Sequence, residues 1–135
     1  MNNFTDREIL KHIFNNYLED FKAYEKNPQI RDSKIYVPID IRKIATALEM
    51  DAELVFGRLY YHLDKKYRYK QENGANVDFF IFKRNENEYH SINFPLLSAV
   101  LADLEDSHRR FSTPLLVSLC ALATSIISLI FSIVT

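Results

Sequence analysis

The side chains that most often perform catalysis or bind metal ions are few in this sequence and are not grouped. Four histidines are predicted to lie in four different elements: His12, His62, His90 and His108. None of them stands at a metal-ligand spacing from another histidine or from a carboxylate. The two glycines are too few for a glycine-rich phosphate loop. We therefore expect no enzymatic activity, no metal site and no cofactor.

A second group of candidate residues is basic and gathers near the middle of the chain. Its members are Arg58, Lys65, Lys66, Arg68, Lys70, Lys83 and Arg84. Residues 34–84 hold ten basic and seven acidic side chains, so the local excess is +3. Three interpretations fit such a cluster: a solvated face that keeps the domain soluble, a contact to a nucleic-acid backbone, or a contact to a protein or an anionic lipid headgroup.

The strongest signal is the uncharged stretch 114–134, PLLVSLCALATSIISLIFSIV. At about 1.5 Å of rise per residue, its 21 residues form a helix long enough to cross the ~30 Å hydrocarbon core of a bilayer. The alternative is an apolar helix that oligomerisation buries. Arg109 and Arg110 precede the stretch and no charge follows it, which favours a head in the cytoplasm. We expect a single-pass, tail-anchored protein of the inner membrane.

Small residues recur along this apolar stretch at spacings of three and four. The predicted self-association seam comprises Ser118, Ala121, Ser125, Ser128 and Ser132, and Thr135 continues its spacing. Spanning helices associate through small residues and hydroxyl groups, so the seam predicts a homo-oligomer. Alternatively, the hydroxyl groups bond to carbonyls of their own helix and have no further role. Whether an assembly would enclose a water-filled pore stays open.

The composition leaves room for one small domain before the tail. The chain has 135 residues, 17 basic and 18 acidic side chains and a net charge of −1, so it has no overall attraction to nucleic acid. Its single cysteine, Cys120, lies in the apolar stretch and cannot form a disulfide within one chain. We expect a domain over 1–111 and a tail over 112–135. The fold class is α+β, mainly α.

The order of elements is predicted from capping residues and hydrophobic periodicity. Thr5 and Glu8 have capping-box spacing before an amphipathic helix that ends at Asn27-Pro28. Two further helices begin after caps at Asp40 and Asp51. A loop is expected at 28–36, between the first and second helices. After the third helix we expect a strand–turn–strand hairpin at 67–83 and a short strand at 90–94. A fourth helix then begins at Pro95 and ends before a tail helix capped by Ser112 or Thr113.

This order resembles that of a winged helix-turn-helix domain. The resemblance rests on Ile41-x-x-Ile44-Ala45-x-x-Leu48, on Val55-x-x-x-Leu59-x-x-x-Leu63 and on the hairpin at 67–83, and it covers roughly residues 5–95. It implies a third helix that often enters the DNA major groove, and a wing that touches the DNA backbone. The fold also includes members that bind only proteins, so it does not fix a function.

The residues expected at the base-reading positions argue against duplex DNA. The start of the third helix carries Asp51, Ala52, Glu53, Phe56 and Gly57, and no base-reading side chain precedes Arg58. The expected linker of about 3–5 residues also holds the domain near a negatively charged membrane surface, which repels a polyanion.

We therefore expect a tail-anchored membrane protein whose cytoplasmic head acts as an interaction or sensing module. Its partners would be membrane lipid, further copies of itself through the tail, and a protein bound by the head, with nucleic acid disfavoured. A small sensor domain joined to one spanning helix resembles the membrane effectors of bacterial antiphage defence, which implies membrane perturbation after clustering. The alternative is a membrane-tethered, DNA-binding transcription regulator.

Overall fold

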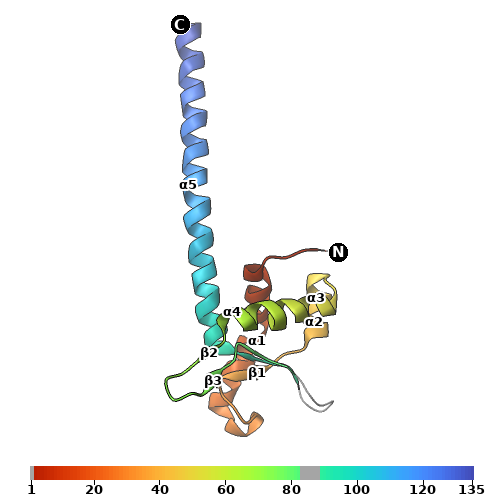
Figure 1. Cartoon of the computed structure of the whole chain (residues 1–135). Coiled ribbons are helices and arrows are strands. Elements are labelled where there is room, and N and C mark those ends of the chain that lie inside the picture. The colour runs from red at the N-terminus through yellow and green to blue at the C-terminus, as the bar shows by residue number, and fades with distance from the viewer. Residues whose placement is uncertain (1, 83–88) are drawn as a thin grey trace. The chain divides into compact units, whose positions relative to one another are not determined.

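The computed structural model describes residues 2–82 and 89–135 of the chain (Figure 1). The chain divides into two compact units, one ending at Leu101 and the other covering Ala102–Thr135. The first unit is built mainly of helices with small antiparallel sheets. This confirms a mainly helical α+β fold with a long apolar helix at the C-terminal end.

Helix α1 (Asp6–Lys26) begins at the predicted capping box. The Glu8 amide donates to Thr5 Oγ1 at 3.2 Å, and the Thr5 amide donates to Glu8 Oε2 at 2.7 Å. Two amides that the helix itself leaves unpaired are thereby satisfied. The helix ends at Asn27, and the short helix η1 (Pro28–Ile30) follows.

Helix α2 (Ile41–Leu48) and α3 (Ala52–Gly57) form the predicted helix-turn-helix. Asp40 accepts a hydrogen bond from the Lys43 amide at 3.1 Å, and Asp51 accepts one from the Glu53 amide at 2.8 Å. Glu49 ends α2 in the left-handed region, with φ 53°. The chain stays helical after α3 through the wider turns of η2 (Arg58–Asp64) and through α4 (Lys65–Tyr67).

The central sheet has the strand order β1-β5-β4 and is antiparallel throughout. Its strands are β1 (Tyr36–Pro38), β5 (Ser91–Asn93) and β4 (Phe80–Ile81). Ile92 is the central position, paired with Val37 on one side and with Phe80 on the other. β5 confirms the short strand expected at 90–94. β1 was not anticipated, because three residues are too few to show a period.

The predicted hairpin at 67–83 is wrong in its pairing. β2 (Tyr69–Lys70) and β3 (Asn76–Val77) form a short ribbon of their own, closed by a turn with Gly74 at φ 84°. β4, expected to continue that hairpin, pairs with β5 instead. The amides of Phe79 and Phe80 both donate to Asp64 Oδ1, which turns the chain away from the ribbon before β4 begins.

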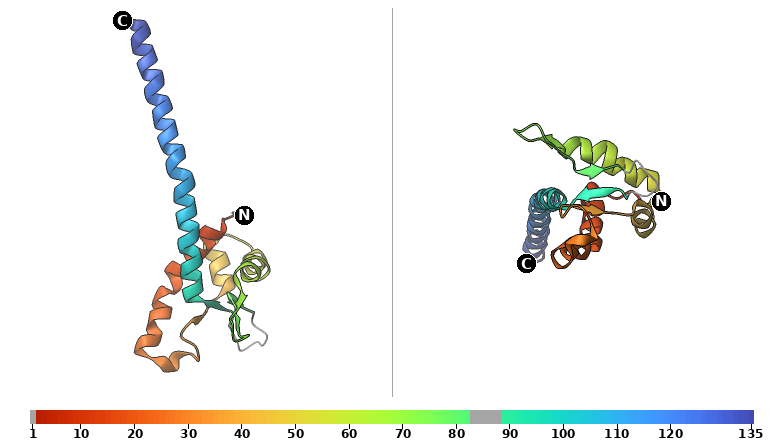
Figure 2. Two further views of the ribbon diagram at one scale, coloured as in Figure 1. Left: turned by 60° about the vertical axis from the view of Figure 1, so that its left-hand side comes forward. Right: turned by 90° about the horizontal axis from the view of Figure 1, so that it is seen from below.

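The core of the first unit lies on both faces of the central sheet. α1 covers one side and the helix from α3 to α4 covers the other (Figure 2). Phe94, at the start of α5, stacks between Phe14 and Phe21, with ring centroids 5.3 and 4.9 Å away. The fully buried side chains include Ile9, Leu10, Ile13, Ile44, Leu59, Leu63, Phe79, Phe80, Ile92 and Leu97.

Helix α5 (Phe94–Val134) corrects the expectation of two helices separated by a break. Asn93 Oδ1 accepts from the Leu96 amide at 3.1 Å at its start. Ser112, expected as a cap, donates its hydroxyl to the His108 carbonyl at 2.8 Å, as residues inside helices do. Pro114 lies within the helix, where its lack of an N–H removes one backbone hydrogen bond without ending the helix.

Within the described residues, α5 is the one helix that is long and apolar enough to cross a membrane. Its most apolar 18-residue window has a mean hydropathy of 2.4, and none of that window is buried. The sequence-based expectation of a membrane-spanning stretch is thus confirmed in length and composition.

Candidate functional site

The apolar stretch of α5 presents its side chains to the surroundings in the single chain. Twelve large apolar side chains between 115 and 134 are more than half exposed: Leu115, Leu116, Val117, Leu119, Leu122, Ile126, Ile127, Leu129, Ile130, Phe131, Ile133 and Val134. Side chains of this kind are normally covered by lipid or by other protein.

Two hydroxyl groups of the predicted seam, those of Ser125 and Ser128, donate hydrogen bonds to carbonyls of their own helix. Ser125 donates to the Ala121 carbonyl at 2.9 Å, and Ser128 donates to the Thr124 carbonyl at 3.0 Å. Ser118, Ala121 and Ser132 lie on the same continuous helix at the predicted spacing. A hydroxyl that bonds back still leaves a small side chain, so close helix approach and back-bonding are compatible.

Arg58 is held by α1 and is not free to read bases. Its Nη1 donates to Asp6 Oδ1 at 2.8 Å, and its Nη2 donates to Asn3 Oδ1 at 3.4 Å. His62 Nε2 lies 3.0 Å from the second oxygen of the same Asp6 carboxylate. Both basic side chains therefore fasten the helix after α3 to the start of α1.

Arg68 is also engaged, by a buried carboxylate. Its Nη2 lies 2.5 Å from Asp64 Oδ2 and 3.4 Å from Asp78 Oδ1. Asp64 is 2% exposed, and its other oxygen accepts the amides of Phe79 and Phe80 at 2.9 and 3.1 Å. This arrangement joins η2 to the first residues of β4 and makes Arg68 part of the fold.

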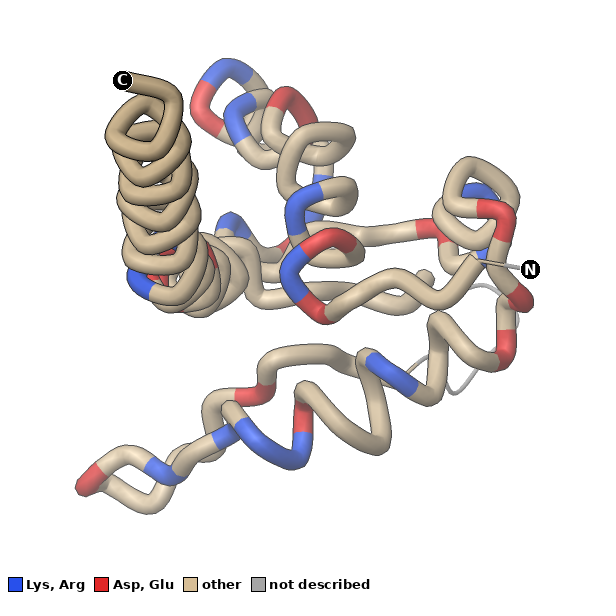
Figure 3. Tube along the Cα trace, turned by 90° about the horizontal axis from the view of Figure 1, so that it is seen from above, with Lys and Arg blue, Asp and Glu red and all other residues tan. Residues whose placement is uncertain are grey.

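Three other predicted basic residues differ from Arg58 and Arg68 because no carboxylate among the described residues neutralises them. Lys65, Lys66 and Lys70 are exposed, and in the part of the chain that the structure describes none of them forms an ion pair. Figure 3 shows basic positions recurring along the helix from α3 to α4 and on into β2. Lys83 and Arg84 lie outside the described residues.

An aromatic cluster between α3–η2 and β4 was not predicted from the sequence. Phe56 lies with ring centroids 5.3 Å from Tyr60, 5.8 Å from Phe80, 5.5 Å from Phe82 and 5.4 Å from His90. The spacing Phe56-x-x-x-Tyr60 and the alternation of Phe80 and Phe82 were the available signals. At the edge of this cluster Tyr61 is 68% exposed.

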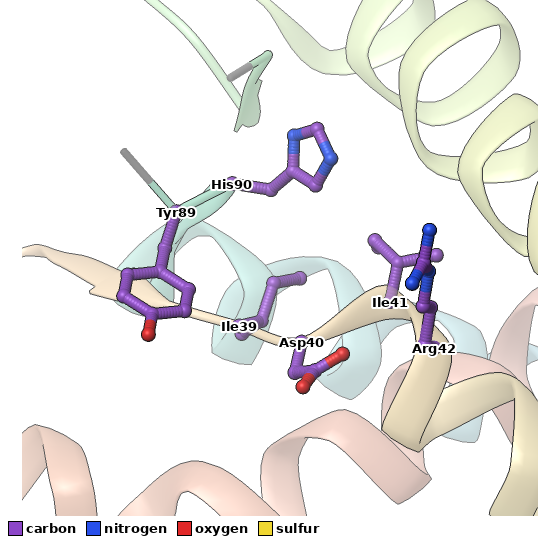
Figure 4. Close-up of a pocket in the computed structure, with 6 residues that line it drawn as sticks. All are labelled: Ile39, Asp40, Ile41, Arg42, Tyr89 and His90. Carbon is purple, nitrogen blue, oxygen red and sulfur yellow. The ribbon is translucent and has the colours of Figure 1, made fainter. Parts of the chain in front are cut away.

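One hollow of the first unit lies where the chain enters α2 and approaches β5. It has a volume of about 370 Å³ and is lined by Ile39, Asp40, Ile41, Arg42, Tyr89 and His90 (Figure 4). Tyr89 and His90, just before β5, point to opposite sides of the backbone. Asp40 Oδ1, at one side of the hollow, accepts the Lys43 amide and so caps α2.

Two titratable groups of α1 have shifted pKa values. Burial raises the pKa of Tyr17, whose hydroxyl oxygen accepts from the Asp40 amide at 3.0 Å. Burial lowers the pKa of His12, which lies on the same helix. Across residues 2–82 and 89–135, no three His, Cys, Asp or Glu side chains converge as metal ligands. The expected lack of catalysis stays a prediction.

No protein-family model, curated protein or solved structure matches this chain. Two surfaces bear on function: the exposed apolar stretch of α5, and the helix from α3 to α4 with its exposed lysines and its aromatic cluster.

Proposed function

We propose that this protein is anchored in a membrane by residues 114–134 of α5 and presents its first unit as a cytoplasmic interaction or sensing module. The observation that carries the proposal is the uncharged apolar stretch that the single chain leaves uncovered. Each of the twelve large apolar side chains contributes about 1.5–3 kcal/mol on full burial. Together they favour transfer of this stretch out of water by on the order of 20 kcal/mol. A bilayer supplies that burial along the entire helix.

We further propose that the first unit is a winged helix. Its order of α1, β1, α2, α3 to α4, β4 and β5, with the sheet order β1-β5-β4, supports this assignment. On this proposal the ribbon of β2 and β3 is an insertion before β4 and not the wing. The helix from α3 to α4 then occupies the position of a recognition helix.

A protein partner suits this helix better than duplex DNA does. Leu54 is 50% exposed and Tyr61 is exposed on it, whereas Arg58 is occupied by Asp6. Asp51 and Glu53 at its start would face DNA phosphates with negative charge. A membrane-tethered transcription regulator is therefore the second proposal, and tight, salt-sensitive binding of residues 1–111 to duplex DNA would establish it in place of the first.

We propose that the tails self-associate and that the clustered protein perturbs the membrane, as an effector in bacterial antiphage defence would. The support is the stripe of small residues on α5 together with the architecture of a small head on a spanning helix. Association in lipid requires close backbone approach, which Ser and Ala permit and Leu does not.

The test is expression of the full chain beside two controls, a chain ending at Ser112 and a chimera whose 114–134 stretch is an unrelated leucine-rich span. The full chain is expected to depolarise cells under activating conditions, as read by a potential-sensitive dye. Both controls are expected to leave the potential intact, although the chimera still enters the membrane. Equal depolarisation by all three would sink the proposal.

A further inference from the structure

We propose that the first unit docks on the anionic lipid surface through a face made of Tyr61, Lys65, Lys66, Tyr69 and Lys70. This inference rests on the proposed membrane anchor and adds a second, reversible contact between protein and lipid. We call these five residues the docking face.

The five residues follow one another along η2, α4 and β2. Tyr61 and Lys65 are four positions apart within continuous helix, which brings their side chains to the same side. Tyr69 comes four positions later, at the start of β2. Tyr61 and Tyr69 are 68% and 52% exposed. Lys66 lies over the Tyr67 ring, with Nζ 5.4 Å from the ring centroid.

The charge of this face is positive because its acidic neighbours are already used. Asp6 is bound by Arg58, while Asp64 and Asp78 are bound by Arg68. Lys65, Lys66 and Lys70 have no such partner within the described residues. Glu72, in the turn of the ribbon, is the one acidic side chain within two residues of Lys70 in the sequence. The cytoplasmic surface of a membrane is negative, so the charges are complementary.

The side-chain types fit a lipid surface. Tyrosine is enriched at membrane–water interfaces, where its ring meets the acyl boundary while its hydroxyl stays hydrated. Lysine extends its apolar stem along such a surface and keeps its ammonium group at the phosphates. The interleaving of exposed tyrosine and lysine along η2, α4 and β2 provides both contacts.

The chain length keeps this face near lipid at all times. Residues 102–113 separate Leu101 from Pro114, and such a segment spans at most about 43 Å when fully extended. A tethered site of weak intrinsic affinity is occupied because its target is always at high effective concentration. The same tether places the face in a field that repels free polyanions, which is why lipid and not nucleic acid is the assigned partner.

The test measures hydrogen exchange of the full chain in nanodiscs of phosphatidylcholine, with and without phosphatidylglycerol. Backbone amides of 60–71 are expected to exchange more slowly in the anionic discs, and high salt should remove this protection. Lys65→Gln with Lys66→Gln should weaken the docking equilibrium by about fivefold per lysine. Lys22→Gln with Lys26→Gln, an equal charge change at exposed positions of α1, should leave it intact.

A second pair, Tyr61→Ser with Tyr69→Ser, separates the aromatic contribution and should also reduce the protection. Equal exchange in neutral and anionic discs would overturn docking alone, because the chain would still be anchored. A chain that fails to enter discs would overturn both the anchor and the docking. Protection produced by added nucleic acid and not by anionic lipid would assign the face to the other partner.

Discussion

At the scale of single residues, Asp64 is the one charged side chain among the described residues that is buried, at 2% exposed. One of its oxygens accepts two amides at the entrance to β4, and the other faces Arg68. Losing the carboxylate would strand two amides in the interior and leave Arg68 without its nearest partner. A buried donor without an acceptor costs more than the hydrogen bond had contributed.

We predict that Asp64→Ala lowers the free energy of unfolding by about 3 kcal/mol. Urea unfolding of the detergent-solubilised chain, followed by tyrosine fluorescence, measures the change, since the chain has eight tyrosines and no tryptophan. Glu53→Ala, at an exposed position of α3, is the control and should change stability by less than about 0.5 kcal/mol. Equal midpoints for the two variants would contradict the role of Asp64.

His12 gives the first unit a dependence on pH. Burial holds its pKa below the ordinary value of 6.5, so below pH 6.5 the unfolded chain binds a proton that the folded chain does not. Its contribution to stability is therefore lost as the pH falls from 6.5 towards the folded-state pKa. We predict that His12→Gln flattens the loss of stability between neutral pH and about pH 5, measured by urea midpoints. An unchanged slope would refute this assignment.

The basic residues show where sequence reasoning stops at this scale. Arg58, Arg68 and Lys65 look alike in the sequence, but the structure pairs the first two with carboxylates and leaves the third exposed without an ion pair among the described residues. The partner of Arg58 is Asp6, which is 52 positions away in the sequence, so local sequence patterns do not predict this ion pair. Nearby charges are visible in a sequence, whereas the carboxylate that folding brings to a guanidinium is not.

At the scale of elements, local signals located the starts of the first three helices, but they divided α5 into two helices, missed β1 and paired β4 wrongly. The Thr5–Glu8 box and the caps at Asp40 and Asp51 were predicted because capping depends on residues two or three positions away. β4 pairs with β5, and its entrance is held by Asp64, which is 15 positions away from Phe79. The nearby turn at Gly74 therefore led to the wrong partner strand for β4. The aromatic cluster around Phe56 also needed three elements to come together.

The first turn of α5 connects β5 of the sheet to α1 through the Phe94 ring, and we predict that this contact stabilises the first unit. Phe94 is 2% exposed and stacks on two rings of α1. Phe94→Ala should lower the free energy of unfolding by about 3–5 kcal/mol, because it leaves a cavity beside two aromatic rings. Phe111→Ala, on the same helix but 83% exposed, should have little effect. The comparison uses urea midpoints, and an equal loss of stability in both variants would contradict the special role of Phe94.

At the scale of the whole molecule, the proposed assembly depends on a contact that one chain cannot display. Ser125 and Ser128 bond to their own helix in the single chain, and the seam is tested only when helices meet. A sequence supports the membrane span strongly, since hydropathy is a sum over residues. It supports a seam more weakly, since many spanning helices contain small residues.

We predict that Ser125→Leu with Ser128→Leu abolishes the oligomer in mild detergent and leaves membrane insertion intact, because the larger side chains keep the helices apart. Ile126→Leu with Ile130→Leu, which preserves size on another face of the same helix, should retain the oligomer. Size-exclusion chromatography with light scattering gives the number of chains. Recovery of the same assembly from the serine double variant would refute the seam.

Both outer borders of the central sheet are closed to further strands. Pro38 in β1 has no N–H to donate to a further strand. At β4, the amides of Phe79 and Phe80 already donate to the Asp64 carboxylate. Many heads concentrated on one patch of bilayer would therefore resist fusing into amyloid-like ribbons. On the proposed clustering, such heads would tolerate crowding in two dimensions and could disperse again.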